Sequence, residues 1–192
     1  MATIQEISER YSALCRFCDT LWQRTANRYP EEIACRTGCA DCCGLETVCA
    51  LEAYHIGKYY DDPAVSLKNL SLHKSGGDHD CALLHEKQCS IYPARPIICR
   101  THGLPIRSKS LTGGLVDCCP LNFNDRDVNA LATDDILDLD MLTDNLMRLN
   151  LAFCLLLGEQ ALAAHRYHLE DIRGGKLPDK LNSSRQQDKK VP

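Results

Sequence analysis

A run of cysteines in the N-terminal third of the chain constrains the sequence most. Four thiols lie within nine residues, in the segment Cys35-Arg-Thr-Gly-Cys39-Ala-Asp-Cys42-Cys43. They cannot all pair with one another as disulfides, because adjacent cysteines bridge poorly and a disulfide needs Cα atoms about 4.4–6.8 Å apart with converging Cβ vectors. Closely spaced thiolates can instead share a soft metal ion or an iron–sulfur cluster. The run therefore predicts metal ligands carried on a loop.

Further cysteines in the same part of the chain extend this pattern. They stand among short apolar segments rather than in long helices, at Cys81, Cys89, Cys99, Cys118 and Cys119. Together with the first run they supply about nine candidate thiolates, more than the four ligands of one tetrahedral zinc ion. We therefore expect several metal ions or a multinuclear cluster, with iron preferred to zinc. Whether Cys118 or Cys119 is the ligand stays open.

The pair Cys42 and Cys43 carries an expectation of its own. Successive side chains tend to diverge, so two adjacent thiolates are expected to serve different metals, or one metal and one redox role. Gly38 and Gly44 punctuate this loop and permit tight backbone turns.

The other cysteines have an apolar setting. Each falls in a segment with helical periodicity, and a free thiol packs there as a small hydrophobe, so we expect core residues at Cys15, Cys18, Cys49 and Cys154. Cys15 and Cys18 could alternatively form a peripheral redox pair, because they lie on one helix face.

Several basic side chains lie beside the candidate ligands. His102 follows Cys99, and His79 and His85 flank Cys81, but so many thiolates make an imidazole ligand unnecessary. Arg95 and Arg100 could lower the pKa values of nearby thiols. An equally good interpretation has Arg95 bonding loop carbonyls.

Charge and composition limit the class of protein. The formal net charge of the 192 residues is −4, which gives no average basic surface, so no nucleic-acid partner is expected. The first residues lack a secretion signal and the apolar run 151–157 is too short to span a bilayer, so we expect a cytoplasmic protein without membrane contact. In that reducing compartment cysteines favour metal binding over disulfides. A protein partner is left open.

Hydrophobic periodicity predicts a mostly helical, small α+β single domain. Helices are expected at 3–28, where Thr3 and Glu6 form a capping box, at 47–60, and at 140–172 in two parts, 140–157 and 161–172, with a short one at 64–74. The predicted domain spans 1–172, and the basic segment 173–192 is expected to be a disordered tail.

The metal-binding core is expected at about 33–120. From Cys81 to Cys119 the chain has short apolar segments separated by prolines and by Gly113-Gly114, which predicts short strands and a hairpin at 112–114. Such a segment buries few apolar side chains, so a bound metal is expected to stabilise it. Pro93 and Pro96 are expected to turn the backbone so that Cys89 and Cys99 approach a common centre.

These residues resemble a known family. The first run, followed by Cys81 and by Cys89-Ser-Ile-Tyr-x2-Arg95-Pro96-x2-Cys99-Arg100, is similar to the YkgJ-type cysteine-cluster family, also called the CxxCxxCC or putative zinc- or iron-chelating domain. The resemblance covers about 33–120 and implies about eight metal-binding cysteines and kinship with the domain of flagellin lysine methylases. Three residues, not two, separate Cys35 from Cys39, so either can match the family's first ligand.

Three classes of function follow. The first is an iron- or zinc-binding protein with a redox, metal-handling or accessory role. The second is an interaction module that zinc holds together. The third is a metal-dependent modifying enzyme. The spacing Cys35-x3-Cys39-x2-Cys42 also matches radical-SAM enzymes, but Asp41 replaces an apolar residue and the βα repeats of that barrel are absent from the sequence pattern.

Overall fold

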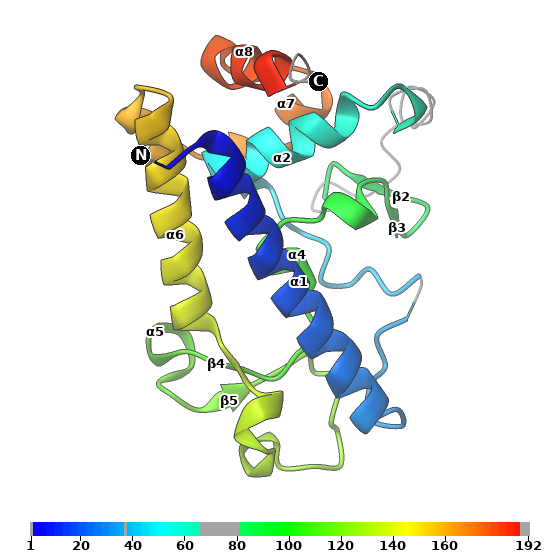
Figure 1. Cartoon of the computed structure of the whole chain (residues 1–192). Helices are drawn as coiled ribbons and strands as arrows, with labels where there is room; N and C mark the ends of the chain where they lie inside the picture. The colour runs from blue at the N-terminus through cyan, green and yellow to red at the C-terminus, as the bar shows by residue number, and fades with distance from the viewer. Residues whose placement is uncertain (1, 37, 66–80, 189–192) are drawn as a thin grey trace. The chain divides into compact units, whose positions relative to one another are not determined.

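The computed structural model describes residues 2–36, 38–65 and 81–188 (Figure 1). Contacts between Cα atoms divide the chain into two compact units, each assembled from two separate segments. Unit 1 comprises Met1–Arg36 and Ile97–Leu149, and unit 2 comprises Thr37–Pro96 and Asn150–Pro192. The nine candidate ligands are therefore shared between the units: Cys35, Cys99, Cys118 and Cys119 belong to unit 1, and the other five to unit 2.

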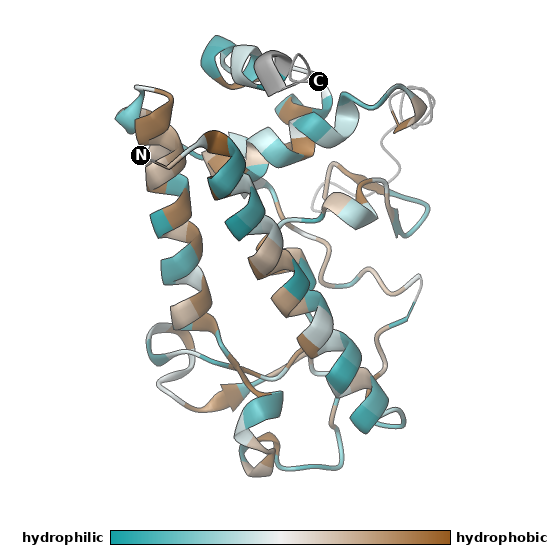
Figure 2. Ribbon diagram, in the orientation of Figure 1, coloured by the Kyte–Doolittle hydropathy of each residue, from teal (hydrophilic) through white to brown (hydrophobic). Residues whose placement is uncertain are grey.

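The long helix α1 (Ile4–Arg28) organises unit 1. Its first turn has the predicted capping box, because the Thr3 side chain accepts from the Glu6 N–H and the Glu6 carboxylate accepts from the Thr3 N–H. One stripe is buried, at Ile7, Tyr11, Cys15, Cys18, Leu21 and Thr25. The short helix α4 (Ile97–Thr101) packs against α1. Figure 2 shows how polar and apolar residues alternate around the turns of α1.

A small mixed sheet completes unit 1. Strand β4 (Ile106–Arg107) pairs antiparallel with β5 (Val116–Asp117) and parallel with β6 (Leu137–Asp138). Between β4 and β5 lie α5 (Lys109–Thr112) and two glycines with positive φ, Gly113 and Gly114, so the reversal predicted at 112–114 is present. The 3₁₀ helices η2 (Val128–Ala130) and η3 (Thr133–Asp135) precede β6, and α6 (Leu139–Leu156) follows it. Residues of α6 up to Leu149 belong to unit 1 and those from Asn150 onward to unit 2.

Unit 2 is built around α2 (Ala50–Tyr60), which is buried on nearly every side. Tyr54 is fully buried, and its ring lies 5.0 Å from that of Phe153. Strand β1 (Thr47–Val48) pairs antiparallel with β7 (Tyr167–His168), and α7 (Leu169–Arg173) and α8 (Asp179–Asp188) pack against α2 (Figure 1). The α2 helix therefore forms the hydrophobic centre of this unit.

A tight hairpin precedes the second segment of unit 1. Strands β2 (Leu84–His85) and β3 (Gln88–Cys89) pair antiparallel, and η1 (Tyr92–Ala94) follows them. The two turn residues, Glu86 and Lys87, both have positive φ, as a type I′ turn requires. The sequence does not predict this turn, because asparagine and glycine are the residues typical of it.

Several expected elements differ from the structure. The second helix starts at Ala50 rather than 47, because Thr47 and Val48 pair with β7. The segment 161–172 is not one helix: η4 (Gln160–Ala163), β7 and α7 divide it. Most of the helix expected at 64–74 lies outside the described residues. The class itself, mostly helical α+β with short strands, is confirmed.

The expectation of a disordered tail is wrong over the described part of 173–192. Helix α8 forms there, and Leu177, Leu181 and Ser184 are buried. Their spacing of four and three residues gives a narrow stripe that covers α2. The sequence did not predict this stripe, because many charged and polar residues surround its two leucines. The domain boundary at residue 172 stays a prediction.

Candidate metal centre

The cysteines separate by exposure in the way the sequence predicts. All four expected core thiols are buried: Cys15, Cys18, Cys49 and Cys154. Burial raises the pKa of Cys18 to about 12 and that of Cys154 to about 11, so these thiols stay protonated at neutral pH. Every one of the nine candidate ligands is instead partly or fully exposed. Only that second set is accessible to a metal ion.

In unit 2, backbone contacts bring Cys43 and Cys81 together. The Cys81 N–H donates to the Cys43 carbonyl at 2.8 Å, although the two residues are far apart in sequence. The Leu83 N–H donates to the Cys81 Sγ at 3.5 Å, and the Leu84 N–H, which donates to the Cys81 carbonyl at 2.9 Å, also lowers the pKa of that thiol. Such N–H groups stabilise a thiolate and so oppose the burial that raises the pKa of Cys81.

Cys89 stands on the same hairpin. Its register partner is Leu84, and the Ile91 N–H donates toward its sulfur. Burial raises the pKa of the Cys89 thiol, the nearby Cys81 raises it further, and the Arg95 guanidinium lowers it. A bound cation would relieve the repulsion between the two sulfurs. Cys81 and Cys89 thus present two sulfurs whose local backbone favours the thiolate form.

The adjacent pair Cys42 and Cys43 does not diverge as expected. The Cys42 thiol is hydrogen-bonded to Cys43, and this bond, with burial and the charge of Cys43, raises the pKa of Cys42. A tight turn is responsible, because the Cys43 N–H donates to the Ala40 carbonyl at 2.9 Å and the Gly44 N–H donates to the Cys42 carbonyl at 3.0 Å. That the two thiols serve different metals, or one metal and one bridging or redox role, stays a prediction.

In unit 1, Cys35 lies against Asn122. The Asn122 Nδ2 lies 3.5 Å from the Cys35 Sγ, and its Oδ1 lies 3.8 Å from the same sulfur. Gly103 makes room for this sulfur: a Cβ there would lie 2.7 Å from the Cys35 Sγ, and the φ of Gly103 is +89°. No spacing motif in the sequence points to Asn122 or Gly103, because both contacts are made by the tertiary structure.

Cys118 belongs to the same group. Its Sγ contacts the Asn122 carbonyl at 3.7 Å and the Cys119 carbonyl at 3.5 Å. Burial and the charges of Asp117, Cys119 and Cys35 raise its pKa. Cys35 is thus one of the charges that act on Cys118 within unit 1, whereas Cys35 and Cys39, four residues apart in sequence, fall in different units.

The flanking basic residues have mixed roles. Arg95 lies 3.6 Å above the Tyr92 ring and donates to the Tyr92 carbonyl at 3.1 Å, so it supports its own loop while it also acts on Cys89. Arg100 is buried and donates to Asp19 at 2.6 Å. It influences the core thiols Cys15 and Cys18.

The candidate histidines give little support for an imidazole ligand. His102 is half-buried, its carbonyl accepts from Trp22 Nε1 at 3.2 Å, and burial lowers its pKa. His79 lies outside the described residues. Across 2–36, 38–65 and 81–188, no three histidine, cysteine, aspartate or glutamate side chains converge closely enough to hold a metal ion.

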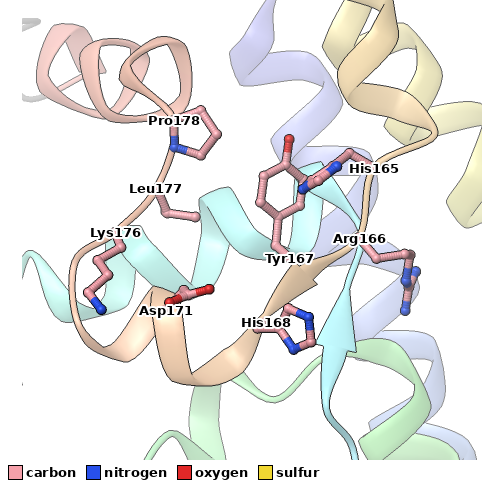
Figure 3. A pocket seen from close by; sticks show the side chains of 8 residues that line it. All are labelled: His165, Arg166, Tyr167, His168, Asp171, Lys176, Leu177 and Pro178. Atoms are coloured by element: carbon pink, nitrogen blue, oxygen red, sulfur yellow. The ribbon is translucent and has the colours of Figure 1, made fainter.

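A cavity of about 420 Å³ elsewhere in unit 2 is less suited to a metal. It lies beside β7 and α7 and is lined by His165, Arg166, Tyr167, His168, Asp171, Lys176, Leu177 and Pro178. Figure 3 shows the Arg166 and Lys176 side chains at opposite ends, pointing away from each other. Its lining offers no thiol and its basic groups do not converge.

Comparison with known proteins supports the thiol-rich segment as the functional region. Residues 34–110 match the model of the CxxCxxCC family, described as a putative zinc- or iron-chelating domain. This match confirms the resemblance noted in the sequence. No curated protein and no solved structure matches the chain. Among the described residues, no helix has the length and apolar character needed to cross a membrane.

Proposed function

We propose that the protein binds iron or zinc through cysteine thiolates and has a redox, metal-handling or accessory role. The proposed ligands in unit 1 are Cys35, Cys99, Cys118 and Cys119. Those in unit 2 are Cys39, Cys42, Cys43, Cys81 and Cys89. The family match to a zinc- or iron-chelating domain supports the metal class and leaves the choice of metal to experiment.

The observation that carries this proposal is the separation of the thiols by exposure. The four expected core cysteines are buried, while the nine candidate ligands are partly or fully exposed, and Cys81 and Cys35 accept a backbone and an amide N–H. Packing alone would favour burial of all free thiols, since cysteine is among the most buried residue types. Accessible thiols supported by N–H donors instead suit metal coordination.

The donor set decides what chemistry a bound metal would supply. Zinc bound by four thiolates is structural, whereas iron bound by thiolates gives reduction and oxidation. Because the thiols outnumber the ligands of one tetrahedral ion, we propose more than one metal ion, with iron preferred. The N–H donors around Cys35, Cys81 and Cys89 would orient the sulfurs, and a bound metal would displace the thiol protons that burial favours.

The first experiment is anaerobic purification with metal analysis and visible absorption. Several iron atoms per chain and a coloured solution would support the iron proposal. One zinc per chain and a colourless solution would instead support an interaction module held together by zinc. Metal-free protein that fails to take up either ion under reducing conditions would contradict the proposal as a whole.

Serine substitution tests the ligand set. Cys81→Ser is expected to reduce bound metal, because it replaces a thiolate by a poor ligand. The matched control is Cys154→Ser, which makes the same change at a buried thiol. It should alter stability but leave the metal content of the folded protein unchanged. Equal metal losses in the two variants would overturn the separation between ligand and core cysteines.

A further inference from the structure

We infer that Asn122 is a positioning residue that donates an amide N–H to the Cys35 thiolate. This inference rests on the proposed function, since it assigns a role toward one of the proposed ligands. Asn122 is 3% exposed, so each polar atom of its side chain must find a protein partner or remain unsatisfied. Its contacts therefore define how the amide is oriented.

The backbone fixes that orientation. The Asn122 Oδ1 accepts from the Ala34 N–H at 2.9 Å, and the Nδ2 donates to the Gly103 carbonyl at 2.8 Å. A flipped amide would place two donors together at Ala34 and two acceptors together at Gly103. The amide is thus held in one orientation by groups that do not titrate. One of its two N–H bonds is used by Gly103, which leaves the second for another acceptor.

The Cys35 sulfur is the acceptor within reach of that second N–H, at 3.5 Å from Nδ2. A protonated Cys35 could instead donate to Oδ1 across 3.8 Å, but a thiolate can only accept. Metal binding requires the thiolate, so the N–H bond is the one compatible with a ligand. Hydrogen bonds to a metal-bound sulfur orient the ligand and tune its basicity.

The same residue links Cys35 to Cys118. The Asn122 carbonyl lies 3.7 Å from the Cys118 Sγ, and the Asn122 N–H donates to the Cys119 carbonyl at 2.9 Å, closing a turn. Next to it, Phe123 has a φ of +56°, is buried and donates its N–H to the Glu32 carbonyl. This anchored turn fixes the backbone of Asn122. Its carbonyl can accept only from a protonated Cys118 thiol, so Asn122 acts as a donor toward Cys35 alone.

The most direct test uses the unmodified full chain loaded with ¹¹³Cd(II), a spectroscopic substitute for zinc. We expect a scalar coupling between ¹¹³Cd and an Asn122 side-chain amide proton, carried through the Cys35 sulfur. Coupling of the metal to the Cys35 β-protons without any coupling to Asn122 would overturn this inference alone. Absence of metal at Cys35 would overturn both the inference and the assignment of Cys35 as a ligand.

A pair of variants adds a second measurement. Asn122→Asp keeps an acceptor for Ala34 but replaces the donor by an oxygen facing Gly103 and Cys35. The matched control is Asn150→Asp: Asn150 is also buried, and it joins the Leu51 N–H and the Ala163 carbonyl at 3.0 Å each. We expect metal affinity at Cys35 to fall about 10–100-fold in the first variant and to be unchanged in the second. Equal losses of metal affinity in the two variants would mean that Asn122 has only a structural role. If Asn122→Asp does not fold, the ¹¹³Cd coupling in the unmodified chain tests the inference instead.

Discussion

Different interactions stabilise the interior of unit 1 and the interior of unit 2. In unit 2 the side chains around α2 are apolar, and Tyr54, Phe153 and Leu181 are completely buried. In unit 1 buried polar groups join distant segments: Asp135 is fully buried and accepts from Arg28 at 2.6 Å and from Tyr29 at 2.9 Å. Arg100 with Asp19 and Arg126 with Glu32 add further ion pairs.

The candidate ligand sulfurs of the two units also differ in the groups that support them. Cys81 and Cys89 sit on a local hairpin and are supported by backbone N–H groups, which no side-chain substitution removes. Cys35 and Cys118 depend on the side chain and turn of Asn122. We therefore expect the first pair to tolerate surface mutations, and the second pair to respond to the loss of a few polar residues.

The largest effect is expected for the apolar core of unit 2. Phe153→Ala should lower the free energy of unfolding by about 4 kcal/mol, because it deletes a fully buried ring and leaves a cavity beside Tyr54. Denaturant unfolding measures this change. The control Phe17→Ala alters a residue that is 46% exposed and should change stability by about 0.5 kcal/mol or less. Similar losses in both would contradict the apolar account of unit 2.

A smaller but selective effect is expected in unit 1. Asp135→Ala should cost about 2 kcal/mol, below the usual range for a broken buried ion pair, because Arg28 is half exposed and can regain water. Hydrogen exchange should increase around η3 and the C-terminal end of α1. The neighbouring Asp134→Ala, at an exposed side chain, is the control. Unchanged exchange in the Asp135 variant would show that unit 1 does not depend on this pair.

The stability of the protein at alkaline pH should depend on the hydroxyl of Tyr167. Burial, with Cys154 and Cys49 nearby, raises its pKa from 10.0 to about 12, and the hydroxyl has no hydrogen-bond partner among the described residues. The folded state thus holds this proton more tightly, so the stabilisation is present below pH 10 and is lost as pH rises toward 12. The difference in unfolding free energy between Tyr167→Phe and the parent should therefore change by about 1 kcal/mol in favour of the variant between neutral pH and pH 11. Parallel pH–stability curves would refute this.

The smallest effect is expected at the exposed pair of Arg126 and Glu32, whose charged atoms lie 2.7 Å apart. The hydrogen bond from Arg126 lowers the pKa of Glu32 below its usual 4.5, so the contribution is present at neutral pH and is lost in acid. Glu32→Gln should shift the unfolding midpoint only slightly, and high salt should abolish the difference. A large, salt-insensitive shift would mean that this pair matters more than its exposure indicates.

The sequence alone predicted the role of the thiols and determined much of the local structure. The cysteine run and the later signature predict metal ligands, and the exposure of those nine residues agrees with the separation from the four core cysteines. The capping box at Thr3 and the helix at α6 were also predicted, because caps and apolar periodicity depend on residues close in the chain.

Only the tertiary structure decided which residues support those thiols. The partnership of Cys35 with Asn122 and Cys118 spans more than eighty residues, and the burial of Leu181 required α2 as its surface. The Cys42–Cys43 hydrogen bond likewise depends on a tight turn that overrides the usual divergence of neighbours. The physical reason is common to all three: a short sequence window specifies what a side chain can do, but its partners are selected by packing between segments distant in the chain.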